Sequence, residues 1–319
     1  MIIGIDLGGS NLRAAIVDGE AAMRDHVREP VGEPRDPETI VERCARVAEK
    51  LSGGEQSSVG IGIAAMLRDR QGTVANSPHL RWRDVAFGQL LARRLGSRFK
   101  VGIYNDVNAI IYGESVGGAA RGCRDVLGVY VGTGIGGGLI VNGQLVEGTS
   151  NCAGEIGHCK VRWDQMAAPC ACGQRGCVEA YCGGNNVQRR ITKELSAGTK
   201  SSAIRHAGGK IEDVNPGHVD MAAADGDEWA LALWTELAPL LAVTLGNAVA
   251  VLNPERLVLG GGMLSRCPTL NTMVESTLMI ATNGASLEPL SIAAAELGDD
   301  AGIVGAAHLA ARDVSIVTA

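Results

Sequence analysis

One local pattern occurs twice in this chain: an apolar strand, a glycine-rich tip and a returning strand. The first copy begins with Ile2 to Ile5, turns through Asp6-Leu7-Gly8-Gly9-Ser10, and returns as Leu12 to Val17. The second begins with Val126 to Val131, turns through seven residues from Gly132 to Gly138, and returns as Leu139 to Val141. These patterns are typical of β-hairpins. Their recurrence at a separation of about 125 residues predicts two related lobes.

Other segments place helices and strands between and after the hairpins. We expect strands at Val59 to Ala64, Val101 to Tyr104 and Arg256 to Leu259, and helices at Glu38 to Leu51, Val107 to Glu114, Asp227 to Val251 and Ala301 to Ala311. The alternation predicts an α/β fold. We expect a smaller N-terminal lobe of residues 1–114 with about 300–319, and a larger C-terminal lobe of residues 115–299 with short crossings near residue 115.

Composition and charge exclude several classes of protein. The chain has 319 residues, of which 46% are hydrophobic and 20% charged, a balance typical of globular domains. Its net charge of -6 argues against nucleic-acid binding. We find no apolar run of about 18 residues and no basic leader before Asp6, so we expect neither a membrane span nor a signal peptide. Nine cysteines without a disulfide pattern fit a reducing cytoplasm.

A cluster of metal-ligand residue types lies near the middle of the chain. His158, Cys170, Cys172 and Cys177 follow the spacing H-x11-C-x-C-x4-C. One imidazole and three thiols are the four ligands that a structural zinc site uses. Cys152, Cys159 and Cys182 are alternative ligands at poorer spacing. The carboxylates Glu155 and Glu179 flank the segment, which indicates a metal-stiffened loop holding polar groups against a ligand.

Three glycine-rich turns follow apolar strands, at Gly8-Gly9-Ser10, Gly132-Thr133-Gly134 and Gly260-Gly261-Gly262. Backbone N–H groups without a neighbouring Cβ can surround a phosphate, although each turn alone is equally well a tight hairpin. Asp6 beside the first turn is a hard oxygen ligand suited to Mg²⁺.

Asn105-Asp106 ends a predicted strand and begins a predicted helix. Asn and Asp are common helix N-caps, and that role alone would explain them. The alternative is that Asp106 accepts the proton of a substrate hydroxyl during phosphoryl transfer.

Taken together, the motifs resemble those of the ROK family of sugar kinases and repressors, in order and over essentially the whole chain. The matching segments are Asp6-Leu7-Gly8-Gly9-Ser10-Asn11-Leu12-Arg13, Asn105-Asp106, the turn from Gly132 to Gly138, Glu155-x-Gly157-His158, the cysteine motif, Leu252-Asn253-Pro254-Glu255 with Gly260-Gly261-Gly262, and Ala301-Gly302-x-x-Gly305-Ala306-Ala307. Within the family the chain is most similar to bacterial glucokinases.

The resemblance implies two actin-like, ribonuclease-H-like α/β lobes with the active site in the cleft between them. It implies ATP-dependent phosphorylation of a hexose at its 6-hydroxyl in the cytoplasm, as in glycolysis, by a homodimer or dimer of dimers. The implied roles are a catalytic base at Asp106, sugar contacts from Asn105, Glu155, His158 and Glu179, Mg²⁺ and ATP phosphate contacts from Asp6, Gly8, Gly9, Ser10, Gly132, Thr133 and Gly134, nucleotide contacts from Gly261 and Gly262, and zinc ligation by His158, Cys170, Cys172 and Cys177.

Two departures from the family pattern leave the preferred hexose open. Family members commonly carry Pro-Asn-Leu where this chain has Pro78-His79-Leu80, so His79 takes the position of a sugar-contacting Asn. Ala64-Ala65 stands where Pro-Gly is usual. The acceptor is therefore glucose or, alternatively, fructose, mannose or an N-acetylhexosamine.

Two non-kinase functions compete with this interpretation. The family also contains repressors, but these carry a helix-turn-helix before the first glycine turn, and Asp6 follows Met1 by five positions. A catalytically silent sugar-binding regulator is the other alternative. The presence of Asp106 and of the glycine turns at Gly8-Gly9-Ser10 and Gly132-Thr133-Gly134 favours the kinase.

Overall fold

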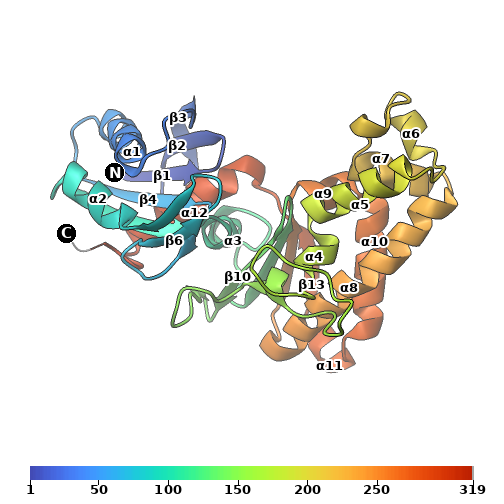
Figure 1. Ribbon diagram of the computed structural model, residues 1–319. Helices are drawn as coiled ribbons and strands as arrows, with labels where there is room; N and C mark the ends of the chain where they lie inside the picture. Colours follow the sequence, from blue (N-terminus) through green and yellow to red (C-terminus); the bar gives the residue numbers. More distant parts are fainter. Residues whose placement is uncertain (318–319) are drawn as a thin grey trace. The chain divides into compact units, whose positions relative to one another are not determined.

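The computed structural model describes residues 1–317 and divides them into two compact units (Figure 1). The first unit contains Met1–Val126, Gly138–Gly154 and the segment from Ala295 onward. The second contains Leu127–Gly137 and Glu155–Ala294. The first unit therefore contains residues 115–126, 138–154 and 295–299, which the sequence prediction placed in the C-terminal lobe.

The first unit is built on a five-stranded sheet of order β3-β2-β1-β4-β8. The strands are β1 (Ile2–Leu7), β2 (Asn11–Val17), β3 (Met23–Pro30), β4 (Ser57–Ile63) and β8 (Phe99–Asn105). The β1–β2 pair is antiparallel, as the glycine-tipped hairpin predicts, whereas β1, β4 and β8 run parallel. Their carboxyl ends therefore meet at one edge of the sheet.

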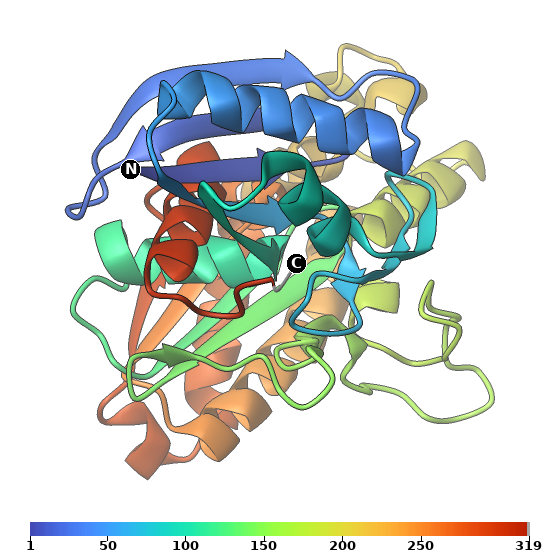
Figure 2. The same cartoon turned by 90° about the vertical axis from the view of Figure 1, so that its left-hand side faces the viewer.

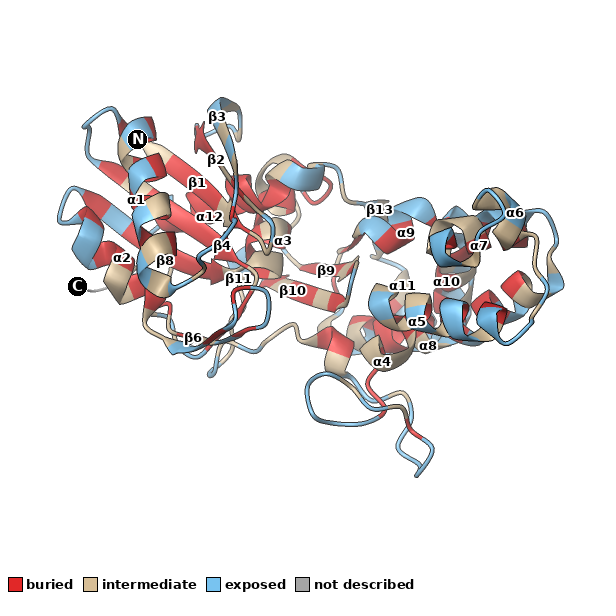
Figure 3. Ribbon diagram, turned by 45° about the horizontal axis from the view of Figure 1, so that its top comes forward, coloured by how far each residue is buried: buried red, intermediate tan, exposed pale blue. Residues whose placement is uncertain are grey.

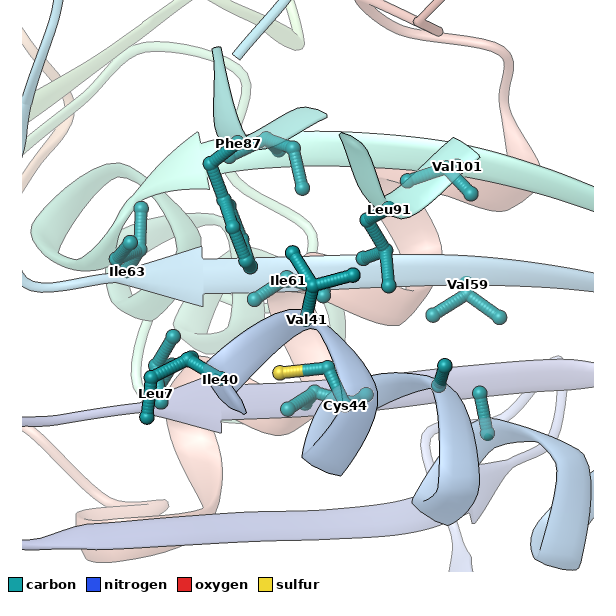
Figure 4. Close-up of a cluster of buried hydrophobic side chains, with 14 of the residues drawn as sticks. Leu7, Ile40, Val41, Cys44, Val59, Ile61, Ile63, Phe87, Leu91 and Val101 are labelled. Atoms are coloured by element: carbon teal, nitrogen blue, oxygen red, sulfur yellow. The ribbon is translucent and has the colours of Figure 1, made fainter. Parts of the chain in front are cut away.

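The two faces of this sheet are covered by different helices (Figure 2). Branched side chains such as Ile61 and Ile63 point toward α1 (Pro37–Ser52) and α2 (Phe87–Leu95), where Cys44, Phe87 and neighbouring apolar residues complete a buried core (Figure 4). Each buried Ile, Leu or Phe stabilises the fold by roughly 1.5–3 kcal/mol. Strands β1, β2, β4 and β8 are largely buried, whereas the edge strand β3 and the outer faces of the helices are largely exposed (Figure 3).

The opposite face packs against α3 (Asp106–Gly117) and α12 (Ala301–Ala311). Gly4 of β1 and Gly60 of β4 lie directly under α12, because a Cβ at either position would collide with the helix backbone at Ile303 or Ala306. Small residues on the sheet thus allow the last helix of the unit to lie close against it.

A small antiparallel sheet completes the first unit, with β5 (Met66–Leu67), β6 (Val74–Ser77) and β7 (Trp82–Val85). The C-terminal segment covers the outer edge of β8, since Ile316 forms a bridge to Gly102 and the Val317 N–H donates to the Val101 carbonyl at 2.8 Å. An open sheet edge is thereby paired.

A second five-stranded sheet has the order β11-β10-β9-β12-β13. Its strands are β9 (Val126–Val131), β10 (Ile135–Val141), β11 (Gln144–Leu145), β12 (Arg256–Gly260) and β13 (Ser291–Ala294). The strands of the two sheets correspond one to one. In each sheet the first three strands are consecutive in the chain, and the fourth and fifth strands follow intervening helices.

Helices make up most of the second unit. They are α4 (Glu179–Cys182), α5 (Gly184–Ser196), α6 (Ala203–His206), α7 (Pro216–Ala224), α8 (Glu228–Leu252), α9 (Gly262–Arg266), α10 (Pro268–Ala281) and α11 (Gly284–Leu287), with 3-10 turns at Ile156–His158 and Ile211–Asp213. A further 3-10 turn, Gly298–Asp300, precedes α12.

The long helix α8 bears on the expectation that the chain has no membrane span. By length and composition alone it is apolar enough to span a membrane. However, it packs against α10, α7 and α4, and Trp234, Leu241 and Leu245 on its inner face are buried. This arrangement is that of a core helix.

Candidate functional site

Asp6 lies near the end of β1, directly opposite Arg13 on β2. Arg13 Nη1 is 3.6 Å from an Asp6 carboxylate oxygen, and Arg13 Nη2 is 2.9 Å from Asp299. Burial raises the pKa of Asp6 to about 6; the Arg13 charge lowers it and the Asp299 charge raises it. Asp6 is therefore a carboxylate whose charge depends on a neighbouring guanidinium.

The register of the parallel strands brings the predicted acid residues to one sheet edge. Asp6 is level with Gly62, and Gly62 with Tyr104, so the chain reaches Asn105 and Asp106 one and two residues past that level. A Cβ on Gly62 would lie 3.8 Å from the Asp106 Cα. Asp6, near the end of β1, and Asp106, directly after β8, thus lie on either side of β4 at the same carboxyl edge.

The predicted N-cap role is correct for Asn105. Its side-chain oxygen accepts hydrogen bonds from the Val107 and Asn108 N–H groups at 3.0 and 3.1 Å, and its amide donates to the Ala65 carbonyl at 3.2 Å. Asp106 is the first residue of α3, and its carboxylate also accepts from Val107 at 3.0 Å. The capping residue and the predicted base are therefore different side chains, with the base at the positive end of the helix dipole.

The first glycine turn is in contact with His79. A Cβ on Gly9 would lie 2.9 Å from the His79 Cβ and 3.1 Å from its Nδ1, so only glycine leaves room for this ring. Arg35 holds the His79 carbonyl with a hydrogen bond of 2.6 Å. The Gly8 N–H donates to Asn11 at 3.1 Å and closes the hairpin, which is the tight-turn role expected as the alternative to phosphate binding.

The second glycine turn is held by the segment that follows the cysteines. Glu179 accepts the Ile135 N–H at 2.8 Å, and the same carboxylate leaves no space for a Cβ on Gly134. The first residues of α5 donate to carbonyls of the turn, Gly184 to Gly132 at 2.9 Å and Asn185 to Thr133 at 3.0 Å. The turn is therefore held by a carboxylate and by a helix start.

The third turn lies beside the second. Gly261 has φ 93° and precedes α9, and a Cβ there would approach the Val131 backbone nitrogen to 2.7 Å. Val131 directly precedes Gly132. The glycine at 261 thus brings β12 against the residue that begins the second turn, while Gly262 starts α9.

The four predicted metal ligands are brought together. The ligand atoms of His158, Cys170, Cys172 and Cys177 all lie within 4.8 Å of one another. The Cys172 and Cys177 sulfurs are 3.7 Å apart, and the Cys170 sulfur is 3.7 Å from His158 Nδ1. Zn–S bonds of about 2.3 Å in a tetrahedron require separations of this size, so the residues fit zinc.

Two carboxylates adjoin the metal cluster. Glu155 lies 3.8 Å from His158 Nε2, the ring nitrogen that faces away from Cys170. Burial raises the pKa of Glu155, His158 lowers it, and Glu179 raises it. The second oxygen of Glu179 is 3.8 Å from the Cys170 sulfur, so this one side chain connects the cluster with the second glycine turn.

The alternative cysteines are outside this cluster. Cys182 is buried and bonds to the Leu237 carbonyl, and Cys152 is exposed and bonds to Ser150. Cys159 is exposed next to His158.

Sequence reasoning missed two charged residues at these sites. Arg13 could have been found from the register of the first hairpin, since it stands opposite Asp6. Lys160, whose ammonium is 3.0 Å from the Cys177 sulfur, carries no motif signal.

Comparisons with known proteins agree with the sequence resemblance. A family model described as "ROK family" matches residues 2–313. A glucokinase of Streptomyces coelicolor is 30% identical over 97% of this chain and 97% of its own length. An N-acetyl-D-glucosamine kinase of Escherichia coli is 30% identical over 98% of this chain and all of its own. A crystal structure of a Streptomyces griseus ROK family glucokinase in complex with glucose and AMPPNP has a TM-score of 0.78 at 30% identity, covering 98% and 99% of the two chains.

Proposed function

The chain belongs to the ROK family, and from this premise we propose that it transfers the terminal phosphoryl group of ATP to the 6-hydroxyl of a hexose, with glucose as the preferred acceptor. The predictions of the family, of its two-lobed actin-like α/β fold and of a sugar kinase are confirmed. The atom phosphorylated and the preferred sugar are the parts that we propose.

The observation that carries the proposal is the position of Asp106. It begins α3 at the sheet edge that also carries Asp6, and Asn105 performs the capping that would otherwise explain it. An aspartate there can accept the proton of the sugar hydroxyl as it attacks phosphorus. Such a base contributes roughly 10²–10⁴-fold to the rate.

We assign sugar binding to Asn105, Glu155, His158, Glu179 and His79. Glu155 is in contact with His158, so carboxylate and imidazole can present acceptors and a donor to vicinal hydroxyls. One Glu179 oxygen accepts the Ile135 N–H and the other lies 3.8 Å from the Cys170 sulfur, so Glu179 would contact the sugar while it also connects the cysteine segment with the second glycine turn.

We assign binding of the ATP phosphates to two turns, one formed by Gly8, Gly9 and Ser10 and the other by Gly132, Thr133 and Gly134. Gly261 and Gly262 would lie near the nucleotide. Asp6 fits Mg²⁺, because a partly buried carboxylate is a hard oxygen ligand and a cation would offset its burial. When bound, Mg²⁺ neutralises charge on the phosphates during transfer.

Zinc has an architectural role in this proposal. Four protein ligands leave no open coordination position for substrate. The metal would anchor the segment from His158 to Cys177 and, through Glu179, the second glycine turn. A cytoplasmic homodimer or dimer of dimers acting in glycolysis remains part of the proposal, drawn from the family resemblance.

A coupled assay across glucose, mannose, fructose and the N-acetylated hexosamines tests the substrate. We expect ATP and glucose to give the highest kcat/KM. A preference for N-acetylglucosamine is the second candidate, because a relative of equal identity carries that activity in its name. Turnover with none of these sugars would contradict the proposed function. Including polyphosphate as donor defines the donor range.

A further inference from the structure

Lys160 follows the metal cluster's first ligand by two residues and points its ammonium at the last. Its Nζ lies 3.0 Å from the Cys177 sulfur. Lys160 itself is exposed, whereas Cys177 is fully buried. The geometry points to a specific role: we propose that Lys160 is a positioning residue of the zinc site, which donates a charged hydrogen bond to the Cys177 thiolate and slows loss of the metal. This inference rests on the proposed zinc site.

The backbone holds the two residues opposite each other. Lys160 and Cys177 form an antiparallel bridge. On either side, the Val178 N–H donates to Cys159 at 2.9 Å and the Val161 N–H donates to Gly176 at 2.8 Å. Directly opposed residues on neighbouring strands place their side chains on the same face. The contact is thus imposed by the local register.

The negative charge of the occupied metal site explains why a cationic side chain would stabilise it. Three thiolates and one neutral imidazole around Zn²⁺ leave a net charge of about -1. Glu155 and Glu179 add negative charge next to His158 and Cys170. An ammonium on the Cys177 side offsets that excess and satisfies a lone pair of a buried sulfur. Groups that bond to a metal's ligands change affinity by about 10–100-fold when removed.

Zinc release measures this role directly. Purified protein is first analysed for zinc, and release to a chromophoric chelator is then timed at low ionic strength. We expect Lys160→Met to release zinc about tenfold faster, the lower end of that range because the ammonium is solvent-exposed. Lys160→Arg, which keeps a charged donor, should stay within about twofold of the parent. Lys200→Met, an exposed lysine of the same unit, removes one charge without touching the cluster and is the matched control.

Two further readouts separate electrostatics from packing. The difference between parent and Lys160→Met should shrink at high salt, because exposed charges are screened. In cobalt-substituted protein, the thiolate-to-metal charge-transfer band should shift in Lys160→Met and not in Lys200→Met. Equal release from Lys160→Met and the parent, or equal acceleration in Lys160→Arg and Lys160→Met, would overturn the role of the charge. Zinc-free parent protein would instead overturn the metal site itself while leaving the kinase proposal standing.

Discussion

Asp6 and Arg13 face each other across the first hairpin, with 3.6 Å between the carboxylate and the guanidinium. Arg13 also reaches Asp299, 2.9 Å away and just before α12. One arginine thus connects the proposed magnesium ligand with the start of the helix that covers the sheet. Because Arg13 lowers the pKa of Asp6 and burial raises it, the charge of Asp6 is set by two opposing effects.

The first prediction concerns pH. The pKa of Asp6 is about 6 in the free protein, so kcat/KM should fall as pH drops through about 6, where the carboxylate gains a proton. Arg13→Met should move this limb to higher pH, since a lowering influence is lost. Asp299→Asn should move it slightly to lower pH, because Asp299 raises the pKa but is itself exposed. Measured pH–rate profiles that move in the same direction for both variants would contradict this account.

The same carboxyl group predicts a stability change. Unfolding returns its pKa from about 6 to 3.8. Between pH 3.8 and 6 the Asp6 carboxyl binds more protons in the folded chain than in the unfolded chain. Its contribution to the free energy of unfolding is therefore fully present below pH 3.8 and is lost as pH rises through 6. The cost at pH 8 is at most about 3 kcal/mol. Asp6→Asn should therefore raise the free energy of unfolding by about 1–3 kcal/mol at pH 8 and change it little near pH 4.

Urea unfolding at the two pH values checks the Asp6 prediction. Asp84→Asn, an exposed acid of the same unit, is the control. An Asp6→Asn gain that is equal at both pH values would show that burial of charge is not its cause.

Substitution of Asp106 should lower turnover without affecting sugar binding. Asp106→Asn keeps the shape of the side chain and an acceptor for the Val107 N–H, but cannot accept the substrate proton. We expect kcat to fall by about 10²–10⁴-fold. Calorimetry should give a sugar Kd within about threefold of the parent. Near-parental turnover would remove Asp106 from the role of base.

The metal cluster predicts a difference between two exposed cysteines. Cys172→Ser should lose zinc and lower Tm by on the order of 5 °C, because one ligand of four is removed. Cys152→Ser, which lies outside the cluster, should keep both zinc and Tm. Metal analysis and thermal melts measure this pair. Equal zinc in both variants would show that Cys172 is not a ligand.

Substitution of Glu114, a residue with no proposed role in substrate binding or catalysis, should have a large effect on stability. It is fully buried and accepts the N–H groups of Ala119, Glu296 and Leu297 at 2.8–3.1 Å. Glu114→Gln places an amide donor against these donors and should cost about 2–3 kcal/mol. Glu288→Gln, an exposed acid, should be neutral. Urea unfolding compares them, and equal stabilities would contradict an anchoring role for Glu114.

Local sequence patterns determined the first hairpin, four of the helices and the membership of the cysteine–histidine cluster. They placed the second hairpin correctly but made its tip too long, because β10 begins at Ile135 and not at Leu139. The glycine-tipped hairpin of β1 and β2 was predictable because strand periodicity and turn glycines act over a few residues. The grouping of His158, Cys170, Cys172 and Cys177 was predictable because their residue types and close spacing are those of a zinc site. The structure was needed to show that Asn105 is the N-cap of α3 and Asp106 its first residue, since either residue type can cap a helix.

Only tertiary structure decided which distant groups meet. The sequence by itself specified residue types, turn positions and the period of each element, because these depend on neighbours along the chain. Three sets of contacts depend on strand register or on the path of a loop. They are the ion pairs of Arg13 with Asp6 and Asp299, the packing of His79 against Gly9, and the contacts of Glu179 with Ile135 and Cys170. Burial likewise raises the pKa of Asp6, and burial is a property of the packed fold.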